Sequence, residues 1–214
     1  LPHRYPIMTP LTELEQDALA EIFNVGVGIA TASLHAMTGQ HVPVSVPEVE
    51  MTSLRQARHH FRHREKRPLC AIRQTYVGDF ETDAVLMFPE EHQLHLTRMM
   101  VGDELPDAEL PEVAQDALGE LGNIVLNAVI SNLASSLGMA LEGSIPVVEF
   151  LSADEILVHK STGDCVEDEA APVLTLMIDF ELSAQRVGGY LAFLLDSDSS
   201  QTLLRHLGAH IQGN

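Results

Sequence analysis

The chain has 214 residues, of which 45% are hydrophobic and 20% charged, and its formal net charge is -19. This composition is typical of a globular protein with a buried core rather than of a disordered chain. The strong negative charge argues against nucleic acid as a partner, because clustered lysines and arginines bind phosphate backbones. No run of about 18 apolar residues occurs, and residues 1–10 lack the apolar core of a signal peptide. We therefore expect no membrane span, no export signal and a cytoplasmic location.

The first predicted element is a long amphipathic helix that starts near Leu11. Thr9 or Thr12, together with Glu15, supplies an N-terminal capping box, and Gly39 supplies the C-terminal cap. Apolar residues recur between them at helical spacing and form the face that would enter the core. The sequence predicts one helix across this whole stretch.

An extended segment at 42–51, a hairpin and a short helix follow. The segments "CAIRQTYV" and "DAVLMF", joined by "GDFET", predict an antiparallel hairpin, and "PEEHQLHLTRMMVGD" predicts a helix that ends at Gly102. Between the strand and the hairpin lies the basic stretch Arg55–Arg67, with six of the chain's twelve Lys and Arg residues. We interpret this stretch as a solvated loop or a strand edge protected by charge, and a docking patch for an acidic partner remains the alternative.

Neither the histidines nor the cysteines form a pattern that predicts a metal site. The histidines of possible zinc-ligand type lie in the basic stretch and in the short helix, without a cysteine beside them: His59, His60, His63, His92 and His95. Cys70 lies in an apolar strand and is expected to be buried. Cys70 and Cys165 suggest neither a disulfide framework nor a catalytic nucleophile. We therefore expect no metal ion and no cofactor in this chain.

The chain contains an internal repeat. When it is shifted by 99 residues, residues 11–50 align with residues 110–149, and 14 of the 40 positions are identical. The similarity continues beyond this block with an offset of 106, which implies about seven added residues in "HKSTGDCVEDEAAP", residues 159–172. Residues 1–214 are therefore expected to form one domain of two repeats, at about 11–102 and 110–208. The predicted fold is α/β (α+β) with pseudo-two-fold symmetry. Its sheet would be antiparallel or mixed, with the two long helices packed on one face.

Both copies retain the same row of polar residues. Asp17, Glu21 and Asn24 fall within about 60° on one face of the first helix, and Pro47 follows Asn24 after 22 residues. The second copy has its counterparts at the same spacing: Asp116, Glu120, Asn123 and Pro146. A solvated face would need polarity but not the same three side chains, and asparagine is an indifferent helix former. Asp17 near a helix start could instead be structural, through its interaction with the helix dipole. Gly26 and Gly28 beside the first row could allow another protein to approach closely.

The pattern D-x3-E-x2-N-x22-P, present at both places, resembles the signature of the CheC, CheX and FliY phosphatases of bacterial and archaeal chemotaxis. Its presence in both halves is most similar to CheC. The resemblance implies a CheC-like fold and hydrolysis of the phospho-aspartate of a CheY-type response regulator in two-component signalling. It implies that Asn24 and Asn123 orient the attacking water and that Glu21 and Glu120 pair with a lysine of the regulator. By the same resemblance, Mg²⁺ would be carried by the regulator.

A second hypothesis belongs to a different class of function. The chain could be a non-catalytic binding module for a response regulator or for a CheD-type receptor deamidase, since CheC proteins can bind CheD. A CheD surface would be expected on the short helix of the second copy, near Asp198–Leu207. We interpret Asp17, Asp116, Pro47 and Pro146 as supporting residues, for capping, for orientation and for the strand that backs the helix.

Overall fold

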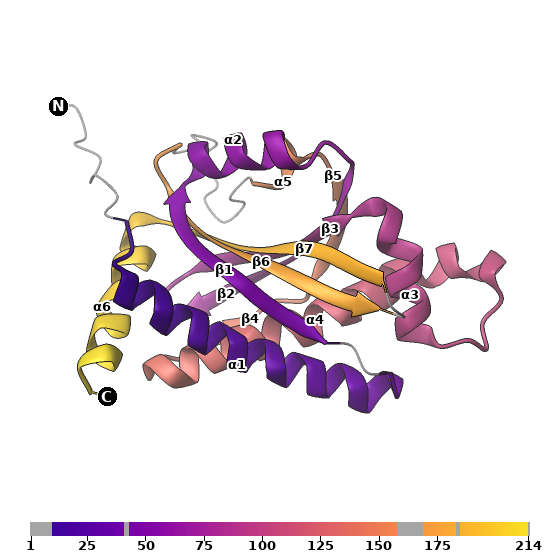
Figure 1. The fold of residues 1–214 in the computed structure, drawn as a ribbon, viewed down its shortest axis with the longest axis horizontal. Helices are drawn as coiled ribbons and strands as arrows, with labels where there is room; N and C mark the ends of the chain where they lie inside the picture. Colours follow the sequence, from indigo (N-terminus) through magenta and orange to yellow (C-terminus); the bar gives the residue numbers. More distant parts are fainter. Residues whose placement is uncertain (1–9, 41–42, 158–168, 183–184, 214) are drawn as a thin grey trace.

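The computed structural model describes residues 10–40, 43–157, 169–182 and 185–213, and it consists of one curved sheet between two layers of helices (Figure 1). The strands are β1 (Val44–Ser53), β2 (Leu69–Gly78), β3 (Thr82–Pro89), β4 (Leu141–Gly143), β5 (Val147–Leu151), β6 (Pro172–Leu182) and β7 (Gln185–Leu195). The α-helices are α1 (Glu13–Thr38), α2 (Leu54–Arg64), α3 (Gln93–Val101), α4 (Leu110–Leu137), α5 (Ala153–Ile156) and α6 (Ser197–Gly213). The 3-10 helices are η1 (Glu90–His92) and η2 (Asp107–Glu109).

The sheet is antiparallel at each described pairing, which confirms that part of the predicted fold class. The strand order is β1–β6–β7–β3–β2, and both β4 and β5 pair with the far side of β2. From the β7–β3 contact outwards, each side presents the last and the middle strand of one repeat and then the first strand of the other repeat. An approximate two-fold axis between β3 and β7 produces this order.

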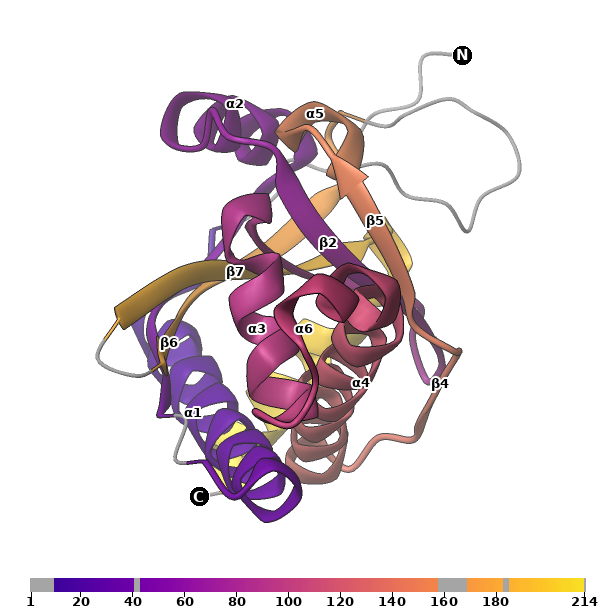
Figure 2. The same cartoon turned by 90° about the vertical axis from the view of Figure 1, so that its right-hand side faces the viewer.

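The long helices α1 and α4 lie side by side on one face of the sheet, as predicted (Figure 2). They approach closely, because a Cβ atom added to Gly26 would lie 2.9 Å from the Cα of Val129. Nearby, Asn132 Nδ2 donates a hydrogen bond of 2.7 Å to the carbonyl of Ile22. α3 and α6 flank this pair and add Leu96 and Leu207 to the same buried cluster. By length and composition, residues 13–38 and 107–137 are apolar enough to cross a membrane, and here part of that apolar surface fills the core.

The capping residues of α1 define its ends. Thr12 is the N-cap: its Oγ1 accepts a hydrogen bond from the backbone N–H of Glu15, and Glu15 Oε2 accepts one from the backbone N–H of Thr12. Gly39 closes the helix in the left-handed region, at φ 69°. The predicted caps at Thr12 and Gly39 are confirmed.

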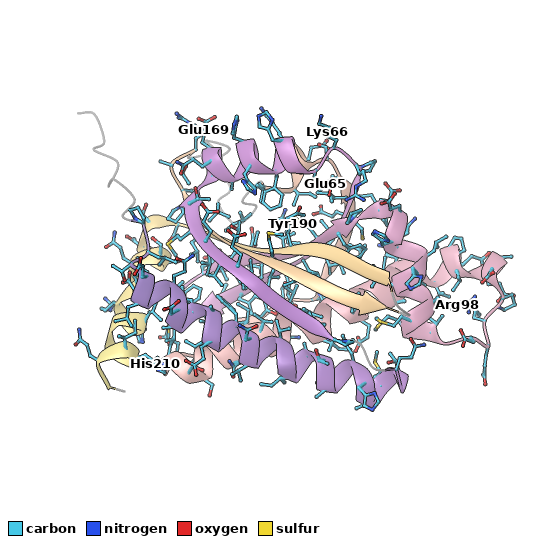
Figure 3. All side chains as sticks on the ribbon, viewed as in Figure 1. Glu65, Lys66, Arg98, Glu169, Tyr190 and His210 are labelled. Atoms are coloured by element: carbon cyan, nitrogen blue, oxygen red, sulfur yellow. The ribbon has the colours of Figure 1, made fainter. Side chains whose placement is uncertain are left out.

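The basic stretch 55–67 is not a loop or a strand edge, so that prediction was wrong. Most of it forms α2, which covers the opposite face of the sheet with Leu54, Ala57 and Phe61 buried beneath it. Phe61 meets the ring of Tyr190 edge-on, with the ring centroids 4.8 Å apart, and Figure 3 shows Tyr190 below this helix. The signals of a helix were present in the sequence: a capping box at Ser53 and apolar residues at helical spacing. The prediction of a loop or a strand edge gave more weight to the basic charges than to these signals.

The predicted insertion at 159–172 falls mostly on residues 158–168, which lie outside the described part of the chain, as does Cys165. From the described end of this stretch, Glu169 forms an ion pair of 2.8 Å with Arg55 of α2. The backbone N–H of Arg55 also donates a hydrogen bond of 3.0 Å to the carbonyl of Glu169, so the acidic segment of the second copy contacts the basic segment of the first.

Candidate functional site

The first polar row lies on the outer face of α1. Asp17, Glu21 and Asn24 are all exposed, whereas Ile22 and Phe23 between them are buried in the core. Phe23 stacks on Phe193 of β7 with a ring-centroid distance of 5.6 Å. This burial fixes the rotation of α1 about its axis, and it directs the Glu and Asn side chains away from the sheet.

The second row lines an open groove of about 620 Å³ between α4 and the segment that links β4 to β5. Asp116 and Glu120 are exposed, and Asn123 is half-buried in the wall of the groove. Ser144 and Ile145 form part of the opposite wall. The second site is therefore concave, with the acid at its surface and the amide deeper.

Both motif prolines lie where an edge strand is interrupted. The pairing of β1 with β6 changes register between Ser45 and Glu48, and Pro47 lies in this stretch. Pro146 separates β4 from β5, which pair with different parts of β2. Proline has no N–H to donate to a sheet, so an interruption at an edge strand is where it is tolerated. Pro146 also lines the second groove.

The motif helices of the two halves pack on the sheet in different ways. In α1 the residue before the motif asparagine is Phe23, whereas in α4 it is Gly122. A Cβ atom at Gly122 would lie 2.2 Å from Ile72 Cγ2 of β2. α4 is therefore pressed directly onto the sheet at this point. The difference between Phe23 and Gly122, which is visible in the sequence, reflects two ways of packing a helix on a sheet.

Of the two glycines beside the first row, only one lies on the outer face. Gly28 is exposed, and a Cβ atom added there would meet nothing within 4 Å. Gly26 is buried against α4, so it serves the contact between the helices and not the approach of another protein. The expectation that both small residues open the site is therefore wrong for Gly26.

Sequence reasoning missed a polar network behind the second site. Asn127, one turn after Asn123, donates from Nδ2 to Asn123 Oδ1 at 2.7 Å. Tyr76 and Gln74 of β2 lie behind it, and their side chains hydrogen-bond to Asn127 and to each other. Two asparagines at i and i+4 on one helix face were the available signal.

No metal centre forms at the histidines or elsewhere in the described part of the chain, where no three His, Cys, Asp or Glu side chains could hold a metal ion. His59 and His63 stack edge-on on α2 with ring centroids 4.4 Å apart. Cys70 is fully buried, as expected, and burial raises the pKa of its thiol to about 12. A thiol in this setting stays protonated at neutral pH and is a poor nucleophile.

Comparison with known proteins gives one matching family profile and two similar sequences. The sequence profile of the family described as "Chemotaxis phosphatase CheX" matches residues 70–166, a range that contains the second motif. The protein named "CheY-P phosphatase CheC" from Bacillus subtilis is 23% identical over 210 residues, which cover 96% of this chain and 99% of the relative. The "Flagellar motor switch phosphatase FliY" from Bacillus subtilis is 24% identical over 166 residues, which cover 77% of this chain and 42% of the relative.

The fold is also found in a solved structure. The crystal structure of Thermotoga maritima FliY superposes with a TM-score of 0.71 at 21% identity, covering 94% of this chain and 98% of that chain. This likeness supports the fold described above.

Proposed function

The chain belongs to the CheC/CheX/FliY family, and on this premise we propose that it hydrolyses the phospho-aspartate of a CheY-type response regulator. The observation that carries the proposal is the repeated pair of an exposed glutamate and an asparagine three residues later, on the outward faces of α1 and α4. The name of the Bacillus subtilis relative, CheY-P phosphatase, supports the substrate class.

In this proposal, Asn24 and Asn123 orient the attacking water. Hydrolysis of an acyl phosphate needs a water in line with the bond that breaks, and its transition state asks for positioning more than for covalent help. An asparagine oxygen can accept a hydrogen bond from that water and hold its lone pair toward phosphorus. Both residues project from the middle of a long helix, which is a rigid support for such a task.

Glu21 and Glu120 pair with a lysine of the regulator in this proposal. A carboxylate placed against a phosphoryl group would be repelled by its negative charge, so direct attack on phosphorus is disfavoured. A salt bridge to a lysine would instead anchor the helix and set the depth at which the asparagine enters. The Glu and Asn are three residues apart, which is about 4.5 Å along the helix axis, so they can act on one regulator site.

Mg²⁺ and the phosphoryl group are both expected to come with the regulator. Magnesium would neutralise charge on the phosphoryl oxygens. The described residues of this chain provide no group of three ligands for a metal ion. The roles proposed for the Glu and Asn side chains require none.

Exposed apolar side chains beside both rows support docking of a protein. On α1, Val25 is 52% and Ile29 is 47% exposed. Beside the second groove, Ile145 is 84% and Val147 is 54% exposed. A partner that covers these side chains would gain free energy from their burial and bring its own active site over the acid and the amide.

The test combines Asn24→Ala with Asn123→Ala and measures dephosphorylation of a ³²P-labelled regulator. We expect the acceleration by the protein to fall by about a hundredfold, because the water is no longer positioned. Binding of the regulator activated with beryllofluoride should change little, since both glutamates remain. Ser135→Ala is the matched control: Ser135 is exposed on α4, and the corresponding position of α1 is already Ala36.

Two results would contradict the proposal. If the double variant is as fast as the parent, the asparagines do not catalyse the reaction. If it loses binding of the regulator together with turnover, the asparagines serve docking, and the non-catalytic binding module becomes the better account.

A further inference from the structure

The second site contains an amide that is held by another amide. Asn127 lies one helical turn after Asn123 on α4, and its Nδ2 donates a hydrogen bond of 2.7 Å to Asn123 Oδ1. Both side chains are half-buried. Side chains at i and i+4 face the same way, so Asn127 supports Asn123 from behind without covering the groove.

This contact continues into the buried part of the sheet. The hydroxyl of Tyr76 donates to Asn127 Oδ1 at 2.8 Å and lies 3.0 Å from Gln74 Oε1. Gln74 Nε2 in turn donates to the backbone carbonyl of Ser144 at 2.6 Å, on the opposite wall of the groove. Tyr76 and Gln74 are each only 2% exposed. The network therefore joins the site amide to rigid β2 and to both walls of the groove.

The network sets the direction in which each group donates. Burial raises the pKa of Tyr76, so its hydroxyl stays protonated and remains a donor. Asn127 Oδ1 accepts from this hydroxyl and from Gln74 Nε2, which can only donate, so Asn127 Nδ2 is the end that faces Asn123. One lone pair of Asn123 Oδ1 is then occupied, and the second lone pair and the amide hydrogens stay available to substrate.

We infer that Asn127 is a positioning residue of the second site, which holds the Asn123 amide in the single orientation that turnover requires. This inference rests on the proposed function. An asparagine amide can rotate by 180° and exchange its donor for its acceptor, and only one of these orientations presents an oxygen to the attacking water. Asn127 disfavours the exchange because a rotated Asn123 would place its NH₂ group against the NH₂ group of Asn127.

The first site cannot use the same device. The position of α1 that corresponds to Asn127 is Gly28, which has no side chain. The two copies thus differ in whether an amide one turn later supports the motif asparagine, although their motifs are identical. A purely structural role for Asn127 would be to satisfy the buried Tyr76 hydroxyl, and the experiment must separate this role from positioning.

The experiment uses the Asn24→Ala protein, in which the second site alone would turn over. We expect Asn127→Ala in this protein to lower kcat for the phosphorylated regulator by about fivefold, which is the scale of one lost hydrogen bond. KM should stay close to that of the Asn24→Ala parent, because Glu120 and the groove are intact. Ser135→Ala in the same protein is the control and should leave kcat unchanged.

A companion pair separates a local effect from a global one. In the Asn123→Ala protein, turnover comes from the first site, and Asn127→Ala should leave that rate unchanged. An equal loss of kcat in both backgrounds would mean that Asn127 supports the fold alone, and the inference would be wrong. Where Asn127→Ala lowers the yield of folded protein, Tyr76→Phe removes the hydroxyl alone, and unchanged kcat in that variant would also overturn the inference.

Failure of the inference can be distinguished from failure of the proposed function. If the Asn24→Ala parent accelerates dephosphorylation and Asn127→Ala keeps its full kcat, only the inference is wrong. If neither the unmodified chain nor the parent accelerates dephosphorylation, the proposed function fails and the inference fails with it.

Discussion

The helices α1 and α4 carry the same motif in two different settings. On α1 the row lies on an open face. Gln16 Nε2 links this helix to β1 by donating a hydrogen bond of 2.6 Å to the carbonyl of Val49. On α4 the row lines a groove of about 620 Å³, and a hydrogen-bonded network supports its asparagine. Beneath the rows, a phenylalanine stacks under one helix and a glycine brings the other against β2.

The comparison shows that the motif and the packing beneath it vary independently. Core residues of the two copies have changed in size, from Phe23 to Gly122, while the Glu and Asn on the outer face have not. Packing alone would not require the same polar side chains on both outer faces. The identical polar side chains on both outer faces therefore support the proposal that one partner binds both rows.

The largest effect expected from the comparison is the loss of Phe23. Phe23→Ala should lower the free energy of unfolding by about 4 kcal/mol, because the ring is fully buried and stacks on Phe193. Urea unfolding at 25 °C measures the change. A loss below about 1 kcal/mol would mean that the packing of α1 on the sheet does not depend on this ring.

The opposite change in α4 should also destabilise the protein. Gly122→Ala places a Cβ atom against Ile72, and overpacking of this kind costs about 2 kcal/mol in the free energy of unfolding. Gly119→Ala is the matched control on the same helix, since the nearest atom to its added Cβ is 3.9 Å away. The control should be neutral or slightly stabilising, and equal losses in both variants would contradict a specific contact at Gly122.

The two glycines of α1 should respond in opposite directions. Gly26→Ala brings a Cβ atom against the backbone of Val129 and should cost about 1 kcal/mol of stability. Gly28→Ala fills open space in a helix and should add about 0.7 kcal/mol. Thermal unfolding measures both. In the Asn123→Ala protein we also expect Gly28→Ala to raise KM for the regulator, and an unchanged KM would contradict a role of Gly28 in close approach.

The smallest effect concerns the covering helix α2, which spans 11 residues, whereas its counterpart α5 spans four. After α2, Arg67 donates from Nε and Nη2 to the nearly buried carboxylate of Glu65 at 2.7 and 2.8 Å. These hydrogen bonds hold the pKa of Glu65 below its ordinary value. Because Arg67 is half exposed, Glu65→Gln should cost only about 0.5 kcal/mol at pH 7.

The pH dependence of this variant has a defined sign. A carboxyl group whose pKa is lowered in the folded state contributes stability above its unfolded pKa of about 4.3. That contribution is lost as the pH falls through the folded pKa. The difference between Glu65→Gln and the parent should therefore shrink as unfolding is measured at successively lower pH. A difference that stays constant with pH would contradict an electrostatic origin.

Much of the fold follows from the sequence by local rules. The capping residues Thr12 and Gly39 define α1, and two apolar segments joined by a short turn define the β2–β3 hairpin. The repeat and the two helical stripes together predicted an antiparallel or mixed sheet with two helices on one face. α2 was missed because the three buried residues that seat it are outnumbered by charged and imidazole side chains facing outward.

Only the part of the site that follows from residue spacing on one helix could be predicted from the sequence. The row at Glu120 and Asn123 follows from periodicity. In the structure Glu120 is exposed, whereas Asn123 is half-buried. Asn127, which supports Asn123, is held in turn by Tyr76 and Gln74, which lie in the other half of the chain. Contacts across such a distance in sequence depend on strand order, which no local pattern specifies.

The most direct test of two separate sites compares the rates of four proteins: the unmodified chain, Asn24→Ala, Asn123→Ala and the double variant. Each is assayed for dephosphorylation of the same regulator at saturating concentration. The account predicts that the two single variants each retain part of the rate and that these parts add up to the rate of the unmodified chain. The double variant should retain about a hundredth of that rate. Complete loss in either single variant, or a double variant as fast as the unmodified chain, would contradict it.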